Sequence, residues 1–148
     1  MASFKQNLML RLVNIWPPIA GAGIRVHWGA DMKSADVEMK LRLWNRNFVG
    51  THYGGSLYSM TDPYYMLMLI KNLGPDYVVW DKAASIRFRK PGKGKVRAEF
   101  RLTDAQLDDI REKLNTLPKY EPTFKVEVKD EAGEVVAEVE KLLHIRKK

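Results

Sequence analysis

The sequence contains no cysteine and only three histidines among its 148 residues. The absence of cysteine excludes disulfide bonds, zinc sites with cysteine ligands and a cysteine nucleophile. The histidines stand at positions 27, 52 and 144, too scattered to suggest a metal site. The sequence therefore predicts no bound metal.

Long hydrophobic runs are also missing. The longest, Tyr64 to Ile70, is far shorter than the roughly 20 residues that span a bilayer. The first 20 residues include Arg11, Asn14 and the Pro17-Pro18 pair, so they lack the clean apolar run and cleavage site of a signal peptide. We therefore expect a cytoplasmic protein with no membrane partner.

The length and the net charge limit the number of domains and the kinds of partner. A chain of this length with 45% apolar residues and no internal repeat predicts a single domain over residues 1–148. Its net charge of +7 permits nucleic acid, an anionic membrane or a small ligand bearing phosphate as partner. Because no helix-turn-helix, RNP or zinc pattern is present, we do not expect a nucleic-acid partner.

The first half of the chain predicts a helix, two strands and a second helix. Phe4, Leu8 and Leu12 keep a helical period until Pro17-Pro18, which should end an N-terminal helix within an extension over residues 1–20. Period-two alternation then predicts strands at 24–28 and 37–43. The apolar stretch 60–73, before Gly74-Pro75, predicts a long core helix buried on most sides.

The second half is dominated by strand patterns. Extended segments at 77–88 and 96–102 are predicted to form a hairpin through the turn at 91–94, and those at 124–128 and 135–145 a second hairpin. Between them, Thr103-Asp104 should cap a polar surface helix over 105–117. This order predicts an α+β fold with a sheet curled around one central helix.

Several segments carry a resemblance to a known superfamily. Asn47, Tyr53-Gly54-Gly55-Ser56-Leu57, Asp62 and Ile86-Arg87-Phe88-Arg89-Lys90-Pro91-Gly92 are similar to motifs of the hot-dog thioesterases, in particular the PaaI-like acyl-CoA thioesterases. Residues 45–52, 61–66 and 79–82 resemble an uncharacterised sister family of unknown function. The resemblance, over residues 24–148, implies a hot-dog fold: a curved antiparallel sheet wrapped around a long central helix, here with an extra N-terminal helix.

The resemblance also implies catalytic roles for three residues. Asp62 would be the base or nucleophile, Gly55 the donor to the oxyanion and Asn47 the residue that orients water or the carbonyl. Tyr53 occupies the place of the family's histidine before the glycines, and His52 is displaced by one position.

Simpler roles stay open for each of the three. Gly55 suits a tight turn, Asp62 a solvated carboxylate or a helix cap, and Asn47 a turn. In addition, Pro63 directly follows Asp62 and favours a kink in the helix.

Other residues are predicted to contact the substrate. Tyr58 and Tyr65 would help to form a pocket for the acyl tail. His52 or Tyr53 would donate to the substrate carbonyl, and Gly54 would offer its N–H group, with Ser56 in the same segment. Arg87, Arg89 and Lys90 would bind the phosphates of coenzyme A. A solvated strand face explains the alternation of these arginines with Ile86 and Phe88 equally well.

The resemblance implies hydrolysis of an acyl-CoA or acyl-carrier thioester, with no cofactor other than the coenzyme A of the substrate. The site would be shared within a homodimer, which can pair further into a homotetramer. Two alternatives remain: a non-catalytic module that binds acyl-CoA or lipid, and a dehydratase or isomerase of acyl thioesters. The missing histidine before Gly54 argues against the latter.

Overall fold

The computed structural model describes Leu8 and residues 10–148. Phe4, the first residue of the predicted N-terminal helix, lies outside the described residues. The elements are, in chain order, η1 (Val13–Ile15), α2 (Pro17–Ala22), β1 (Ile24–Trp28), β2 (Ser34–Lys40), α3 (Gly54–Ser59), α4 (Tyr64–Leu73), β3 (Tyr77–Phe88), β4 (Lys95–Arg101), α5 (Asp104–Thr116), β5 (Thr123–Lys129) and β6 (Val135–Lys147). As expected, the helical residues before Pro17-Pro18 end with η1 and a bend at Trp16. Pro17 then begins a separate helix, α2, because proline suits the first turn, where its missing N–H has no partner to lose.

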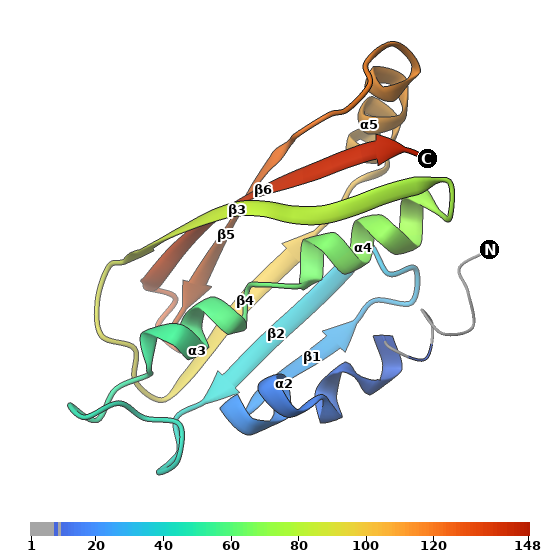
Figure 1. The fold of residues 1–148 in the computed structure, drawn as a ribbon. Coiled ribbons are helices and arrows are strands. Elements are labelled where there is room, and N and C mark those ends of the chain that lie inside the picture. The colour runs from blue at the N-terminus through green and yellow to red at the C-terminus, as the bar shows by residue number, and fades with distance from the viewer. Residues whose placement is uncertain (1–7, 9) are drawn as a thin grey trace.

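The strands form one antiparallel sheet in the order β1-β2-β4-β5-β6-β3, curved around α3 and α4 (Figure 1). Along β4, the side chains of Val96, Ala98 and Phe100 are buried and those that alternate with them are exposed. The inner face therefore packs on the helices and the outer face carries charge. The predicted α+β class and the curved sheet around a central helical layer are confirmed.

The predicted hairpin of β3 with β4 is wrong. β3 pairs with β6 at one edge of the sheet, whereas β4 lies between β2 and β5. The connection does not turn back on itself because its backbone bonds elsewhere: Arg89 N–H donates to the Val136 carbonyl at 2.8 Å, and the Gly92 carbonyl accepts from His52 N–H at 2.9 Å. These bonds lead the chain around the N-terminal end of α3 (Figure 1).

The core helix predicted over 60–73 begins only at Tyr64, as α4, and α3 is a separate helix before it; the kink expected at Pro63 is a full break. The break follows from Pro63, which has no N–H to donate to the carbonyl of Ser59 four residues earlier. That carbonyl instead accepts from Asp62 N–H at 3.3 Å, and the Thr61 hydroxyl donates to the Tyr58 carbonyl at 2.7 Å. The backbone therefore turns between the two helices at Asp62.

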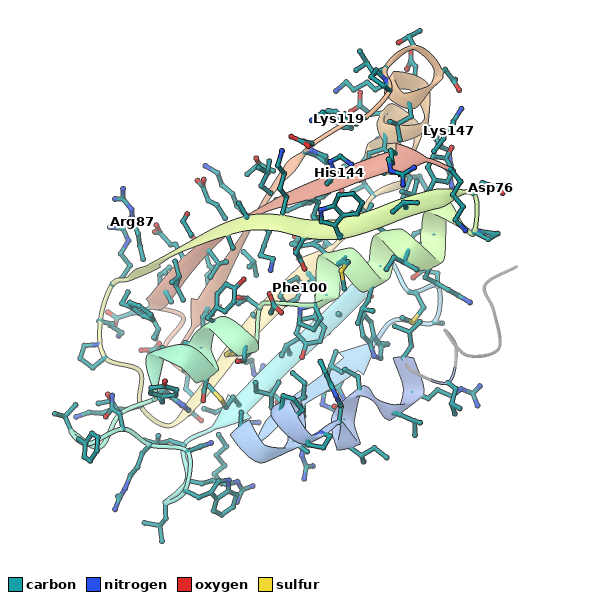
Figure 2. All side chains as sticks on the ribbon, viewed as in Figure 1. Asp76, Arg87, Phe100, Lys119, His144 and Lys147 are labelled. Atoms are coloured by element: carbon teal, nitrogen blue, oxygen red, sulfur yellow. The ribbon has the colours of Figure 1, made fainter. Side chains whose placement is uncertain are left out.

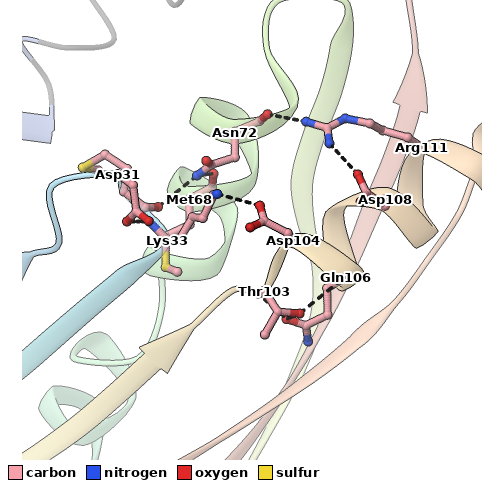
Figure 3. Close-up of polar contacts among 10 residues, drawn as sticks. Asp31, Lys33, Met68, Asn72, Thr103, Asp104, Gln106, Asp108 and Arg111 are labelled. Atoms are coloured by element: carbon pink, nitrogen blue, oxygen red, sulfur yellow. Dashed lines mark hydrogen bonds and ion pairs between the residues drawn. The ribbon is translucent and has the colours of Figure 1, made fainter.

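Hydrogen bonds fix α5 to the far end of α4 (Figure 3). Thr103 and Gln106 form a capping box at the start of α5, which confirms the predicted cap. The Arg111 guanidinium donates to the Asn72 carbonyl at 2.9 Å, and the Asn72 amide donates to the Met32 carbonyl at 3.0 Å. The excursion between β4 and β5 is thus tied to α4 and to the β1–β2 turn. None of the helices in the described part of the chain is long and apolar enough to cross a membrane.

Phe100 lies at the centre of the layer between sheet and helices (Figure 2). It is fully buried, and its ring centroid lies 5.1 Å from those of both Tyr64 and Tyr65 on α4. We expect Phe100→Ala to lower the free energy of unfolding by about 3–5 kcal/mol, because it leaves a cavity under α4. Urea denaturation followed by circular dichroism measures this loss. Leu117→Ala, at an exposed position, is the control and should change stability by less than about 0.5 kcal/mol.

Candidate active site

Asp62 lies in the break between α3 and α4, where its carboxylate is held by two donors. The Tyr58 hydroxyl donates to Oδ1 at 2.9 Å, and the Lys141 ammonium donates to the same oxygen at 2.7 Å. Lys141 also donates to the Tyr58 oxygen at 3.2 Å, so the three groups form a closed triangle. The helix break is what turns Asp62 towards the strand that carries the lysine.

Lys141 is a lysine at a core position. It lies on β6 in phase with Val139 and Leu143, both buried, and its own side chain is 0% exposed. Asp81 Oδ1, on β3, also lies 3.2 Å from the ammonium and forms an ion pair with it. A bulge in β3 between Asp81 and Ala83 shifts the register at this point.

Sequence reasoning missed Lys141, although a signal was present. The alternation Val135, Ala137, Val139, Leu143, Ile145 places residue 141 on the inner face, and a charged residue in that phase is rarely buried without a partner. Asp81 was likewise not singled out, although it stands in the same phase as the buried Val79.

The charges of the cluster follow from burial and contact. Burial lowers the pKa of Lys141, but the hydrogen bond to Asp62 and the charge of Asp81 outweigh it, so the pKa lies above its usual value. Burial raises the pKa of Asp81, which the charge of Lys141 only partly offsets. Burial and the hydrogen bond to Asp62 also raise the pKa of Tyr58. At neutral pH Lys141 is thus an ammonium and Tyr58 a neutral phenol.

One oxygen of Asp62 stays available for chemistry. Within the described part of the chain, no hydrogen bond or ion pair reaches Oδ2, and the side chain is 47% exposed. A carboxylate fixed through one oxygen and open at the other can accept a proton from water or attack a carbonyl.

Gly54 and Gly55 begin α3, with two aromatic rings against them. A Cβ on Gly55 would fall 2.5 Å from Cε1 of Tyr53, and one on Gly54 would fall 3.0 Å from Cζ of Phe88. Both rings are more than half exposed. Neither glycine N–H has a hydrogen-bond acceptor among the described residues, so both are open to a ligand. The close rings give these glycines a packing role whether or not they bind an oxyanion.

The Asn47 side chain is used within its own loop. Its amide donates to Thr51 Oγ1 at 2.9 Å and to the His52 carbonyl at 3.4 Å, and its Oδ1 accepts from the N–H groups of Val49 and Thr51. These bonds stay within residues 47–52 and do not bring Asn47 to Asp62. Its predicted orienting role remains a prediction.

His52 is turned away from the glycines. The ring is buried, and Nε2–H donates to the Gly94 carbonyl at 2.9 Å in the loop before β4. Burial lowers the pKa of His52 and keeps the ring neutral. Ser56 is buried in α3 beneath the glycines. Neither contacts the Asp62 cluster, and their predicted substrate contacts remain predictions.

The remaining predicted residues fall into two groups. Tyr58 joins Asp62, whereas Tyr65 is a core residue whose ring stacks on Phe124 with the centroids 4.6 Å apart. Arg89 and Lys90 already have carboxylate partners: Arg89 pairs with Glu138 on β6 at 2.6 Å, and Lys90 pairs with Asp130 and Glu134 in the turn between β5 and β6. Arg87 is exposed and points away from the helices at the end of β3 (Figure 2).

A second ionic cluster lies on the opposite face of β6, around His144 (Figure 2). Glu121 accepts from His144 Nδ1 at 2.7 Å and pairs with Lys82 at 2.9 Å and Lys119 at 3.3 Å. The hydrogen bond from His144, with that from Lys82, lowers the pKa of Glu121 to about 2. The cluster ties β3 and β6 to the segment before β5. Among the described residues, no group of three or more His, Asp or Glu side chains could hold a metal ion.

The crowding of Gly55 by Tyr53 gives a stability prediction. We expect Gly55→Ala to destabilise the wild-type protein, because the new methyl group must displace the Tyr53 ring. In a Tyr53→Ala background the same change should be neutral or stabilising by up to about 1 kcal/mol, since alanine favours a helix over glycine. Urea unfolding of the four proteins in this double-mutant cycle measures the coupling. An equal stability change for Gly55→Ala in both backgrounds would show that the Tyr53 ring is not the reason for glycine at position 55.

Comparisons with known proteins agree with this fold. A structure from Pseudomonas aeruginosa, named as a protein of unknown function and probable thioesterase, has a TM-score of 0.83 and 24% identity and covers 100% of this chain and 99% of its own. A thioesterase structure from Haemophilus influenzae has a TM-score of 0.66 and 13% identity, and the match covers 99% of this chain and 93% of that one. The Escherichia coli PaaI protein of the phenylacetic acid degradation operon has a TM-score of 0.63 and 14% identity, and the match covers 100% of this chain and 96% of that one.

These likenesses confirm the predicted hot-dog fold, and at these identities they show the fold alone. None of the curated proteins matches the chain. One family model does, that of a domain of unknown function, DUF4442, and it matches residues 5–145. The predicted kinship with an uncharacterised sister family of the hot-dog thioesterases is thereby confirmed, and the chain belongs to the DUF4442 family.

Proposed function

We propose that this protein hydrolyses a thioester of coenzyme A or of an acyl carrier. The observation that carries the proposal is the state of Asp62, which is anchored through Oδ1 by Lys141 and Tyr58 while Oδ2 stays open. Hot-dog proteins named as thioesterases share the fold, which makes this chemistry the natural one to test. The cytoplasmic location remains a prediction from the sequence.

In the proposed reaction Asp62 acts as the base. Oδ2 takes a proton from water while the water oxygen bonds to the thioester carbonyl carbon, and the Gly55 N–H donates to the oxyanion that forms. Collapse of the tetrahedral intermediate breaks the C–S bond, and the departing sulfur takes the proton back from Asp62. The products are a carboxylic acid and a thiol. Direct attack by Asp62 is the other course open to the same group, through an anhydride that water then hydrolyses.

The proposed site is shared between two copies of the chain. β3 forms one edge of the sheet over twelve residues, and Ala83, Ala84 and Ser85 at its centre are exposed. The opposite edge, β1, has only five residues. A long, unpaired edge with small side chains can accept the same strand of a second copy. Such pairing would bring the glycines of one protomer towards Asp62 of its partner, as the resemblance implies.

We therefore expect a dimer of about 34 kDa in solution, twice the 17.1 kDa of one chain, or a tetramer built from it. Light scattering coupled to size exclusion measures the mass. Ala84→Pro removes a backbone donor from β3 and should weaken the dimer. A wild-type protein that stays monomeric at the concentrations used for assays would contradict the shared site.

The phosphates of coenzyme A would meet the cations at the end of β3. Arg87 is exposed and forms no ion pair within the described part of the chain, whereas Arg89 and Lys90 are engaged by carboxylates. Arg87 is therefore our candidate for the phosphate contact, and the other two would bind only by exchanging partners.

The test of the proposed function is thiol release from acyl-CoAs with short, long and aromatic acyl groups, followed with a thiol-reactive dye. The protein has no cysteine and so gives no background. Asp62→Asn should lower kcat by about 100- to 10,000-fold on the substrate that the wild type hydrolyses, because it removes the base and keeps the shape. Glu112→Gln, at an exposed position on α5, is the matched control and should keep full activity. A fully active Asp62→Asn protein would contradict the proposal.

The second candidate is a binding module without catalysis. It is favoured by Asn47, whose amide is used within its loop, and by Tyr53 in place of a histidine. Binding of a non-hydrolysable acyl-CoA analogue without release of thiol from any thioester would support this candidate.

A further inference from the structure

The burial of the Lys141 ammonium is not explained by the fold alone. Among the described residues no other lysine or arginine is buried, and burial of an ammonium costs free energy unless carboxylates and hydrogen bonds compensate. An apolar residue would fill the same inner position of β6 at no such cost. The lysine is therefore a candidate for a functional role.

The surroundings of the ammonium show what it does. It donates to Asp62 Oδ1 at 2.7 Å and to the Tyr58 oxygen at 3.2 Å, and it lies 5.2 Å from the centre of the Tyr58 ring. Asp81 faces it from β3. The charged end is thus held between two strands and the helix break, with one carboxylate on each side. Because its side chain is 0% exposed, Lys141 cannot reach a substrate.

We propose that Lys141 is the positioning residue of Asp62: with Tyr58 it fixes Oδ1, so that proton transfer in thioester hydrolysis runs through Oδ2. This inference rests on the proposed function. Asp81 anchors the lysine from the β3 side and balances its charge. Lys141 remains an ammonium, has no free electron pair and therefore does not act as a nucleophile.

The kinetic test compares Lys141→Met and Lys141→Arg with Leu143→Ala. Leu143 lies two residues further along the same buried face, so its truncation disturbs the packing of β6 without removing a charge. With the thioester that the wild type hydrolyses, Lys141→Met should lower kcat about 100-fold and leave KM nearly unchanged, since a displaced base impairs the chemical step alone. Lys141→Arg should recover part of this loss. Leu143→Ala should keep kcat near the wild-type value.

Chemical rescue separates the charge from the volume of the side chain. In Lys141→Ala, propylamine in its protonated form replaces the missing atoms and charge, whereas propan-1-ol replaces the volume with a neutral group. Turnover should rise with propylamine and not with propan-1-ol, after subtraction of the reaction of amine with thioester in the absence of protein. Equal rescue by both compounds would assign Lys141 to packing and overturn the inference.

A measurement on the folded protein covers the case in which the Met variant does not fold. With ¹⁵N-labelled lysine, the Lys141 ammonium should give a protected NMR signal, identified by its loss in Lys141→Arg, and the signal should shift in Asp62→Asn. An unshifted signal would show that the two groups are not in contact and would overturn the inference.

The outcomes for the two proposals can be told apart. If the wild type releases thiol from no thioester, the proposed function fails and the role of Lys141 falls with it. If the wild type is active and Lys141→Met retains its kcat, the hydrolase stands and only the positioning role is overturned.

Discussion

A buried ammonium between two carboxylates is the constraint on which the candidate site depends. Lys141 is held by Asp62 from the helical layer and by Asp81 from the edge strand, so one charge joins the two layers of the fold. Such a pair is tolerated because each partner compensates for the water that the other has lost. The same contacts fix the orientation of the carboxylate that faces solvent. The same ion pair thus links the two layers of the fold and serves the proposed chemistry.

The break in the central helix is the second part of this arrangement. In an unbroken helix Asp62 would be one more side chain on a continuous surface. Pro63 ends the hydrogen-bond ladder, and the turn at residues 60–63 directs the carboxylate to β6. The Tyr58 hydroxyl then completes the contact from the last turn of α3. Pro63, which was expected to kink the helix, thus helps to bring Asp62 to its partner Lys141.

In the loop before α3, polar side chains bond to the protein itself. Asn47 has the spacing expected of a functional residue, but its side chain bonds within the loop. His52 stands one position from the place of the superfamily's histidine, and its Nε2–H donates to the Gly94 carbonyl. Tyr53 stands against Gly55 where the superfamily has a histidine. These contacts give the loop a defined shape, and no described residue accepts a hydrogen bond from the two glycine N–H groups. The chemistry proposed for this chain accordingly relies on Asp62 and on Gly55.

Local patterns in the sequence were sufficient for most of the fold. Alternation and helical spacing predicted the strands, the polar helix with its Thr103 cap and the buried central helical layer, because these depend on neighbours a few residues apart. The motif around Gly54 and Asp62 was sufficient to indicate the superfamily. The hairpin of β3 with β4 was predicted from the turn residues at 91–94, and it failed because the bonds of Arg89 and Gly92 to distant segments determine where the chain goes.

What the sequence determined by itself was the set of elements and the presence of a candidate carboxylate beside two glycines. Only the tertiary structure decided which strands form the two edges of the sheet and which cation holds Asp62. Residues 62 and 141 are far apart in the chain, and no local pattern pairs a carboxylate with a lysine at that separation. The pairing exists because β6 passes under the helix break, and that placement follows from the packing of the whole sheet.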